Sequence, residues 1–219
     1  MLNKIIQGDC LQVMKDIPDK SIDLILADLP YGTTRNKWDS IIPLDLLWEQ
    51  YNRIIKDNGA IVLTAQTPFD KVLGVSNLKM LRYEWIWGKP SGTGHLNAKK
   101  MPMKNHENIL VFYKKLPVYN PQMRVGKPYA IKSGKGSSNY GKQESVVTEN
   151  KGERYPLSVI GFNPNKGFHP TQKPTALFEY LIKTYTNENE TVLDNCIGSG
   201  TTAVACLNAN RNFIGIELE

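Results

Sequence analysis

Short apolar runs alternate with helical patterns along this chain. Residues 22–27 are apolar but for one acid and stop at Asp28, and residues 60–65 form a second run. Such runs are typical of parallel strands that are buried on both faces. Between them, residues 43–57 carry an apolar stripe at helical spacing, with a proline at the start and Gly59 near the end. This order of elements predicts an α/β fold with a mostly parallel sheet.

The same patterns predict the remaining elements of one α/β domain. Residues 83–87 alternate and residues 107–113 are mainly apolar, so each is expected to form a strand. A helix is expected to run from Pro174 through Thr184. The other expected elements are strands at residues 4–7, 190–194 and 212–217, and a helix at residues 201–210.

An acid, a proline and an aromatic residue follow the first buried strand, as Asp28-Leu29-Pro30-Tyr31. Ligands bind at the carboxyl ends of strands in open α/β sheets. Pro30 fixes its own φ and biases Leu29 towards extended geometry, so the turn is stiff. Two acceptors, the Asp28 carboxylate and the Leu29 carbonyl, then lie beside an aromatic ring and suit a planar ring with an exocyclic NH2 group. These residues alone are equally compatible with a strand that ends in a turn with a solvated aspartate.

A glycine-rich turn follows the expected strand at residues 190–194 and precedes a helix. The next strand ends at Glu217, about 17 residues after Gly200. Strand, glycine turn, helix, strand and acid form the layout of a nucleoside-cofactor site. The glycines admit the ligand close to the backbone, and the acid can accept hydrogen bonds from ribose hydroxyls.

Three ordered motifs resemble those of the DNA amino-methyltransferases, which methylate adenine N6 or cytosine N4 with S-adenosylmethionine. Residues 28–31 are similar to the family's catalytic tetrapeptide, and residues 194–202 to its cofactor loop. The family motif His-Pro-Thr-Gln-Lys-Pro is present unchanged at residues 169–174. The catalytic motif precedes the cofactor motif, which is the order of the family's β group.

This resemblance implies a Rossmann-like methyltransferase fold with an antiparallel hairpin at the edge of its sheet. It also implies S-adenosyl-L-methionine as cofactor and DNA, double-stranded rather than single-stranded, as partner. Asp9 would reach the cofactor's adenine, although an N-cap of the following helix is its alternative role. The implied catalytic residues are Asp28, Leu29, Pro30 and Tyr31, and the implied cofactor-binding residues are Asp9, Lys173, Asp194, Gly198, Ser199, Gly200, Thr201 and Glu217.

Aspartate at the head of the tetrapeptide favours adenine N6 over cytosine N4, because the N4 enzymes commonly have serine there. Asp28 and the Leu29 carbonyl would accept the two N6 hydrogens, Tyr31 would stack on the extruded base, and Asp28 is expected to contact only the target amine. Cytosine N4 methylation and a non-catalytic DNA-binding relative are the alternatives. Two departures affect the motifs: Leu29 replaces a proline, and Asn195-Cys196 replaces a Pro-Phe pair.

Positive charge is concentrated in the middle of the 219-residue chain, whose net charge is +6. Residues 89–151 hold 12 Lys and Arg and three Glu, a net charge of +9. We therefore divide the domain into a catalytic half (1–113), a basic target-recognition insertion (114–165) and a cofactor-binding half (166–219). A disordered surface insertion is the alternative for the middle segment. The residues expected to contact nucleic acid are Arg35, Lys37, Lys132, Lys135 and Lys142.

The remaining composition favours a cytoplasmic protein, and the resemblance implies one encoded by a bacterium or a phage. No apolar run approaches the roughly 18 residues needed to span a membrane, and the N-terminus does not resemble a signal peptide. The three cysteines are an odd number without metal-ligand spacing, and no metal site is expected. A homodimer is compatible with the sequence.

Overall fold

The computed structural model describes residues 1–33, 39–132, 147–164 and 172–218. It divides into two compact units. The larger comprises Met1–Asn120 and Ser158–Glu219, and the smaller comprises Pro121–Leu157. In the described part of the chain, no helix is long and apolar enough to cross a membrane.

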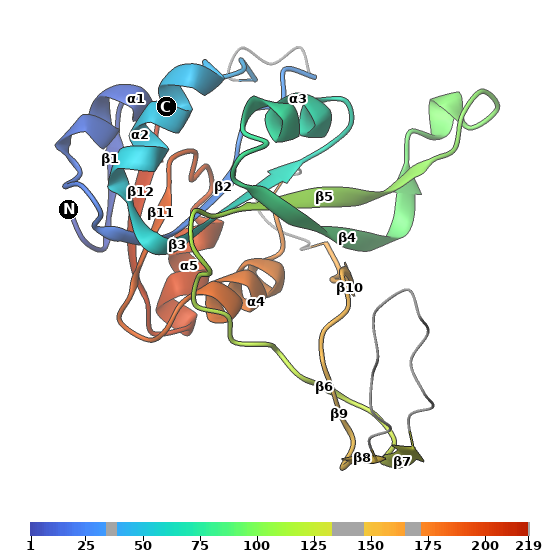
Figure 1. Ribbon diagram of the computed structural model, residues 1–219. Coiled ribbons are helices and arrows are strands. Elements are labelled where there is room, and N and C mark those ends of the chain that lie inside the picture. The colour runs from blue at the N-terminus through green and yellow to red at the C-terminus, as the bar shows by residue number, and fades with distance from the viewer. Residues whose placement is uncertain (34–38, 133–146, 165–171, 219) are drawn as a thin grey trace. The chain divides into compact units, whose positions relative to one another are not determined.

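The larger unit is built on an eight-stranded sheet, counted over the described residues, with the strand order β1-β12-β11-β2-β3-β5-β4-β10 (Figure 1). The strands from β1 to β3 in this order are parallel, whereas β5 is antiparallel to both β3 and β4. The predicted α/β class and the predicted antiparallel hairpin are therefore confirmed. The bounds are β1 Lys4–Gln7, β2 Ile22–Asp28, β3 Ile55–Ala65, β4 Leu81–Thr93, β5 Lys104–Phe112, β10 Val159–Gly161, β11 Thr191–Asp194 and β12 Asn212–Glu217.

Helices cover both faces of this sheet, and the side chains of β2 alternate between them. Ile25 and Ala27 belong to the core under α1, α2 and α3, whereas Leu24 and Leu26 belong to the core under α4 and α5. All four side chains are fully buried, which explains the nearly continuous apolar run in the sequence. The helices are α1 Cys10–Val13, followed by the 3-10 turn η1 Met14–Asp16, and α2 Leu44–Ile54, α3 Phe69–Ser76, α4 Thr175–Tyr185 and α5 Thr201–Asn208.

The end of α2 differs from the predicted one. The helix ends at Ile54, and β3 begins at once, so the predicted end of the helix at residue 57 is wrong. Gly59 does not stop the helix but lies in β3, where the register with β2 shifts. A Cβ on Gly59 would lie 2.8 Å from the Asp23 carbonyl oxygen, so the close approach of the two strands requires glycine there.

The outer edge of the sheet carries one strand that the sequence pattern did not predict. β10 pairs in parallel with β4 outside the hairpin, through Val159, Ile160 and Gly161. A three-residue strand is too short to show a periodic pattern, so it could not be predicted from the sequence.

The smaller unit holds two short antiparallel ladders. β6 Arg124–Val125 pairs with β9 Glu153–Arg154, and β7 Tyr129–Lys132 pairs with β8 Val147–Asn150. Every described strand residue in it is exposed or half-buried, and the Arg154 guanidinium lies 4.4 Å from the Tyr129 ring centroid. The unit lies within the predicted insertion 114–165, whose described ends at residues 114–120 and 158–164 belong to the larger unit. Its role in target recognition stays a prediction.

Candidate active site

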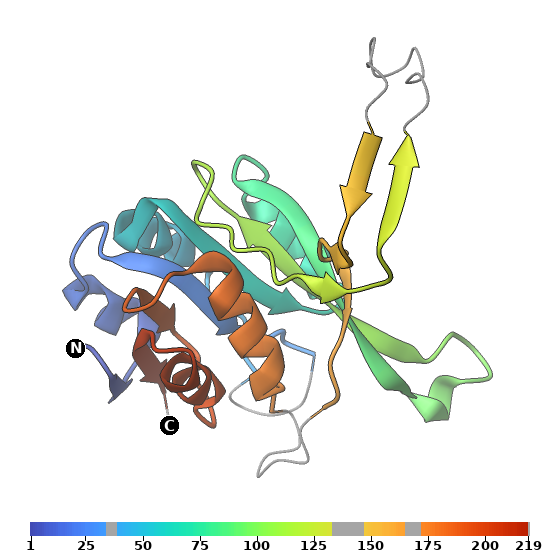
Figure 2. The ribbon, with the colours of Figure 1, turned by 90° about the horizontal axis from the view of Figure 1, so that it is seen from below.

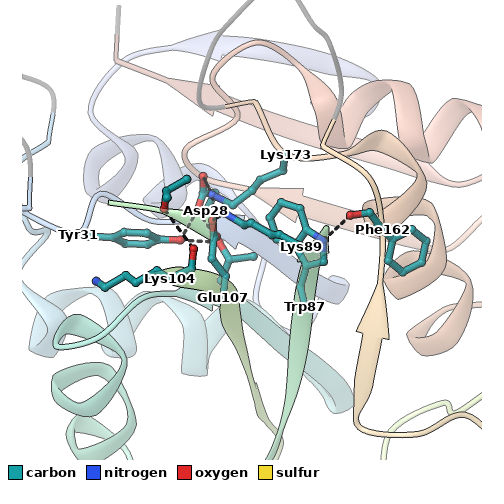
Figure 3. A network of polar contacts seen from close by, with 10 residues as sticks. Asp28, Tyr31, Trp87, Lys89, Lys104, Glu107, Phe162 and Lys173 are labelled. Atoms are coloured by element: carbon teal, nitrogen blue, oxygen red, sulfur yellow. Dashed lines mark hydrogen bonds and ion pairs between the residues drawn. The ribbon is translucent and has the colours of Figure 1, made fainter. Parts of the chain in front are cut away.

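The acid predicted to be catalytic lies at the carboxyl end of β2, where three hydrogen-bond donors surround it. Asp28 is paired in register with Thr64 of β3. The Tyr31 hydroxyl donates to Asp28 Oδ1 at 2.6 Å, and the Thr64 hydroxyl donates to the same oxygen. Lys173 Nζ lies 2.6 Å from Asp28 Oδ2 (Figure 3). The expectation that Asp28 contacts only the target amine is therefore wrong, because neighbouring side chains already orient both oxygens.

Two carboxylates and two ammonium groups form a continuous charged cluster, which we call the catalytic cluster (Asp28, Lys173, Glu107 and Lys89). Lys173 Nζ lies 3.3 Å from Glu107 Oε2, and Lys89 forms an ion pair with Glu107 Oε1. Glu107 is only 4% exposed. A buried carboxylate is tolerated when it is paired, and the two lysines here balance the two acids.

The charges of the cluster set the protonation of its members. Burial lowers the pKa of Lys173, but the carboxylates of Asp28 and Glu107 outweigh this effect, so the pKa lies above its ordinary value. Burial and the charge of Asp28 raise the pKa of Tyr31 well above its ordinary value. Lys173 therefore stays cationic and Tyr31 stays a hydroxyl donor at neutral pH.

Aromatic neighbours fix the positions of Tyr31 and Lys89. The Tyr31 ring stacks on Phe69 with centroids 5.4 Å apart. Lys89 Nζ lies 4.6 Å from the Trp87 ring centroid, and the Trp87 indole donates to the Phe162 carbonyl at 2.9 Å (Figure 3). The site is thus bordered by rings from α3 and β4, and the Phe162 carbonyl after β10 holds the Trp87 ring.

The turn after Tyr31 is closed by Asp39. Its two carboxylate oxygens accept from the backbone N–H groups of Gly32 at 2.8 Å and Thr33 at 2.9 Å. Gly32 has a φ of 66°, and a Cβ there would lie 2.9 Å from Ile41. Leu29, in the place of the usual first proline, is 3% exposed and packs in the core. Arg35 and Lys37 lie outside the described residues.

The glycine loop (residues 195–200) follows β11, the strand beside β2. Gly198 and Gly200 have φ values of 50° and 84°, and a Cβ built on either would meet no described atom within 4 Å. Gly198 N–H donates to Glu217 Oε2 at 2.6 Å, and Gly200 precedes the first turn of α5. Ser199 is exposed and Thr201 is buried. The loop therefore presents open backbone, a helix N-terminus and the Glu217 carboxylate on one side.

Asp194 lies under this loop and is 2% exposed. Its carboxylate accepts from the Cys196 backbone N–H at 3.0 Å and from the Thr202 hydroxyl. Burial raises the pKa of Asp194 to about 7, although these hydrogen bonds oppose the shift. In this structure its two oxygens hold the loop.

Asn195-Cys196, the pair that replaces Pro-Phe of the family motif, is bound by a residue of α2. Asn195 is 2% exposed, and its Oδ1 accepts from the hydroxyl of the fully buried Tyr51. Its amide also donates to Cys196 Sγ at 3.4 Å. Tyr51 belongs to the apolar stripe predicted at residues 43–57, and its full burial places that stripe in the core. Its anchoring role could not be predicted, because 144 residues separate the partners.

Asp9 lies at the end of β1, next to β12. The pairing of Gln7 with Glu217 brings these two strand ends together. Asp9 Oδ1 accepts from Gln12 N–H at 3.1 Å, so the alternative N-cap role is observed. Contact with the adenine of a cofactor stays a prediction for Asp9.

The residues expected to contact nucleic acid are only partly described. Lys132 is exposed at the end of β7 in the smaller unit. Lys135 and Lys142 lie outside the described residues, as do residues 169–171 of the motif that contains Lys173. Three members of the site were missed by sequence reasoning: Thr64, Lys89 and Glu107. A charged residue at the start of an apolar strand was the available signal for Glu107, but solvated acids at strand ends look the same in a sequence.

Comparisons with known proteins agree with this geometry. Type II methyltransferase M.BglII of Bacillus subtilis is 32% identical over 246 residues, which cover 100% of this chain and 66% of that protein. DNA adenine methyltransferase YhdJ of Escherichia coli (strain K12) is 30% identical, over 98% of this chain and 78% of its own. The crystal structure of the M1.HpyAVI-SAM complex superposes with a TM-score of 0.67 at 26% identity, over 99% of this chain and 94% of that one. Residues 22–219 match the model of the N6/N4 methyltransferases, described as DNA methylase, and this chain belongs to that family.

Proposed function

We propose that this protein transfers a methyl group from S-adenosyl-L-methionine to the N6 amine of adenine in DNA. The observation that supports this most is the placement of Asp28 beside the glycine loop. Both lie at the carboxyl ends of neighbouring strands, β2 and β11, where ligands of α/β sheets bind. A donor of methyl groups and an amine acceptor could therefore meet at one edge of the sheet.

The residues around the glycine loop suit the cofactor. Open space above Gly198 and Gly200 admits a nucleoside close to the backbone. Glu217 accepts from Gly198 and Leu218 N–H groups, which leaves lone pairs for ribose hydroxyls. When bound, S-adenosylmethionine supplies a methyl group already activated on a sulfonium.

The catalytic half would make the amine a better nucleophile. The lone pair of an exocyclic N6 amine is delocalised into the ring. Asp28 and the Leu29 carbonyl would accept the two N6 hydrogens and so favour a pyramidal nitrogen whose lone pair points at the methyl group. Pro30 keeps the turn stiff, and Tyr31 would hold the extruded base by stacking. Alignment supplies much of the rate in such an in-line displacement.

The ion pair between Lys173 and Asp28 would weaken when the amine binds. Lys173 Nζ is shared between Asp28 at 2.6 Å and Glu107 at 3.3 Å, so a second carboxylate is available to it. Contact between Lys173 and the methionine carboxylate of the cofactor, implied by the family motif, remains part of the proposal.

Cytosine N4 is the alternative acceptor, since the family contains enzymes of both kinds. Aspartate at position 28 favours adenine, and the presence of Asp28, Pro30, Tyr31 and Lys173 argues against a DNA-binding relative without activity. The chain spans 66% of the length of M.BglII, so a methyltransferase activity like that of the whole M.BglII is a proposal for this chain.

Methylation of a random-sequence duplex pool tests the activity. Mass spectrometry of the digested DNA should find N6-methyladenine, and sequencing of modified bases should give the recognition site. N4-methylcytosine alone would favour the alternative acceptor. Binding of S-adenosylmethionine without any transfer would favour the non-catalytic relative.

DNA is the proposed partner in a bacterial or phage-derived cytoplasmic setting, and residues 114–165 are the proposed target-recognition segment. Neutralising Lys132, Lys135 and Lys142 together should flatten the plot of log affinity against log salt by up to about 3 units, near 0.9 for each lost phosphate contact. An unchanged slope would move target recognition elsewhere, and the loop with Arg35 and Lys37 would be the next candidate.

A further inference from the structure

The hairpin of β4 and β5 extends far beyond the sheet. Figures 1 and 2 both show it, in green, reaching past the neighbouring strands. The strands are paired up to Gly88 and His106, the register then shifts, and pairing resumes at Thr93 and Lys104. We call residues 90–106 the hairpin arm. All of its residues are exposed except the half-buried Gly92. An isolated hairpin is marginally stable at best and adds little to the core, so a role in binding is the natural explanation for the arm.

The arm combines positive charge with apolar side chains at its tip. It holds three lysines and two histidines and no acid. Leu96, in the 3-10 turn at the tip, is 87% exposed, and Met101 is 55% exposed. Lys99 and Lys100 lie between them in the sequence. An apolar tip flanked by ammonium groups is complementary to a polyanion that also offers apolar surface, and stacked bases between two phosphate backbones form such a surface.

The base of the arm adjoins the catalytic cluster. Lys89 pairs with Glu107, and Lys104 Nζ donates to the Thr67 carbonyl at 3.1 Å, just past the end of β3 (Figure 3). At about 3.3 Å per strand residue, the outer end of the paired strands lies about 10 Å from Glu107. With bases spaced about 3.4 Å apart, base pairs near a base held at Asp28 fall within reach of the tip.

We propose that the hairpin arm binds duplex DNA beside the target base. Lys99 and Lys100 contact phosphates, and Leu96 with Met101 enters the base stack where the target base has left it. Extrusion of a base leaves a gap whose unstacked faces are apolar, and Leu and Met are among the side chains that proteins insert between base steps. We call this insertion of Leu96 and Met101 the wedge. It rests on the proposed function, because it requires an extruded base, whereas phosphate contact requires only that DNA binds.

A salt series tests the phosphate contact. Lys99→Gln/Lys100→Gln should flatten the plot of log affinity for a 30-base-pair duplex against log salt by about 1.8 units, near 0.9 for each lost contact. The matched control is Lys15→Gln/Lys20→Gln, two exposed lysines before the start of β2 and outside the proposed target-recognition segment, which contact Gln12 and Asp57. An unchanged slope, or an equal change in the control, would overturn the proposal.

Two duplexes that carry the sequenced site test the wedge, one with the target base paired and one with it opposite an abasic position. Leu96→Ala/Met101→Ala should lower the transfer rate about tenfold on the paired duplex and less than about twofold on the other, where the base is already unpaired. Leu78→Ala, an exposed leucine at 64% outside the proposed target-recognition segment, is the control. Equal losses on the two duplexes would overturn the wedge. If the wild type transfers methyl groups to neither duplex, the proposed function fails, and the salt series still decides whether the arm binds DNA.

Discussion

The two halves of the site lie side by side but are held together differently. In the glycine loop, backbone groups make the main contacts: Gly198 N–H binds Glu217, and Gly200 N–H binds the Ile197 carbonyl at 3.0 Å. In the catalytic cluster, charged side chains make the contacts, and 145 residues separate Asp28 from Lys173. Apart from the bond between Tyr51 and Asn195, the described contacts of the first half lie within residues 194–217, whereas the second half is held by long-range ion pairs. Substitutions should therefore change binding in the first and turnover in the second.

The largest effect is expected in the catalytic cluster. Asp28→Asn keeps the size of the side chain but replaces one acceptor oxygen with an NH2 group. Turnover should fall about a thousandfold, equivalent to about 4 kcal/mol, because a preorganised charged acceptor at the reacting nitrogen is lost. Affinity for S-adenosylmethionine should change little. Transfer of a labelled methyl group and calorimetric titration measure the two quantities. Exposed Asp16→Asn is the control, and turnover within tenfold of the wild type would contradict the assigned role.

The same contrast explains what the sequence could predict. The glycine loop and Glu217 could be located because their spacing follows from one strand, one turn and one helix. Lys89 and Glu107 could not, since their pairing depends on how β4 and β5 align, and a one-residue change of register would turn their side chains to the other face. Gly59 was wrongly predicted to end a helix for a similar reason. Glycine is required there because the Asp23 carbonyl on another strand leaves no room for a Cβ. Tertiary contacts decided each of these positions.

A pH series tests the glycine-loop half of the site through the free energy of unfolding. Burial raises the pKa of Asp194 to about 7, whereas an aspartate in an unfolded chain titrates near 3.9. The folded state therefore keeps a proton that the unfolded state releases, so this contribution is present below about pH 4 and is lost as pH rises to about 7. A shift of about three units corresponds to about 4 kcal/mol at most.

The asparagine in Asp194→Asn cannot titrate, so the free energy of unfolding of this variant should fall less as pH rises. Urea unfolding at several pH values between 4.5 and 7.5 gives the free energy of unfolding for both proteins. The difference between wild type and variant should change steadily across this range, while exposed Asp16→Asn should follow the wild type. Parallel curves for Asp194→Asn and the wild type would contradict the raised pKa.

A smaller effect is expected on the cofactor side. Glu217→Ala removes the carboxylate that binds Gly198 N–H and that we propose binds ribose. Affinity for S-adenosylmethionine should weaken by roughly 1 to 3 kcal/mol, the usual loss for a hydrogen bond to a charged group. Turnover at saturating cofactor should change far less. Calorimetric titration checks this, with exposed Glu188→Ala as control. Unchanged affinity would show that Glu217 shapes the loop without contacting the cofactor.

The smallest effect tests how the catalytic cluster shares its charges. Glu107→Gln removes the second carboxylate near Lys173 and leaves Asp28 as the only acid that pairs with it among the described residues. Lys173 should then hold Asp28 more tightly, so the carboxylate accepts less readily from the target amine. Turnover should fall about tenfold, or about 1.4 kcal/mol, with cofactor affinity unchanged.

A second variant distinguishes this effect from a packing defect. Glu107→Gln leaves the half-buried Lys89 without its carboxylate partner, so some stability should be lost as well. Lys89→Gln/Glu107→Gln removes that ammonium group and should recover part of the stability. Its turnover should stay low, because Lys173 still has no second acid. If turnover recovered together with the free energy of unfolding, Glu107 would act through packing alone, and the charge-sharing role of the cluster would be wrong.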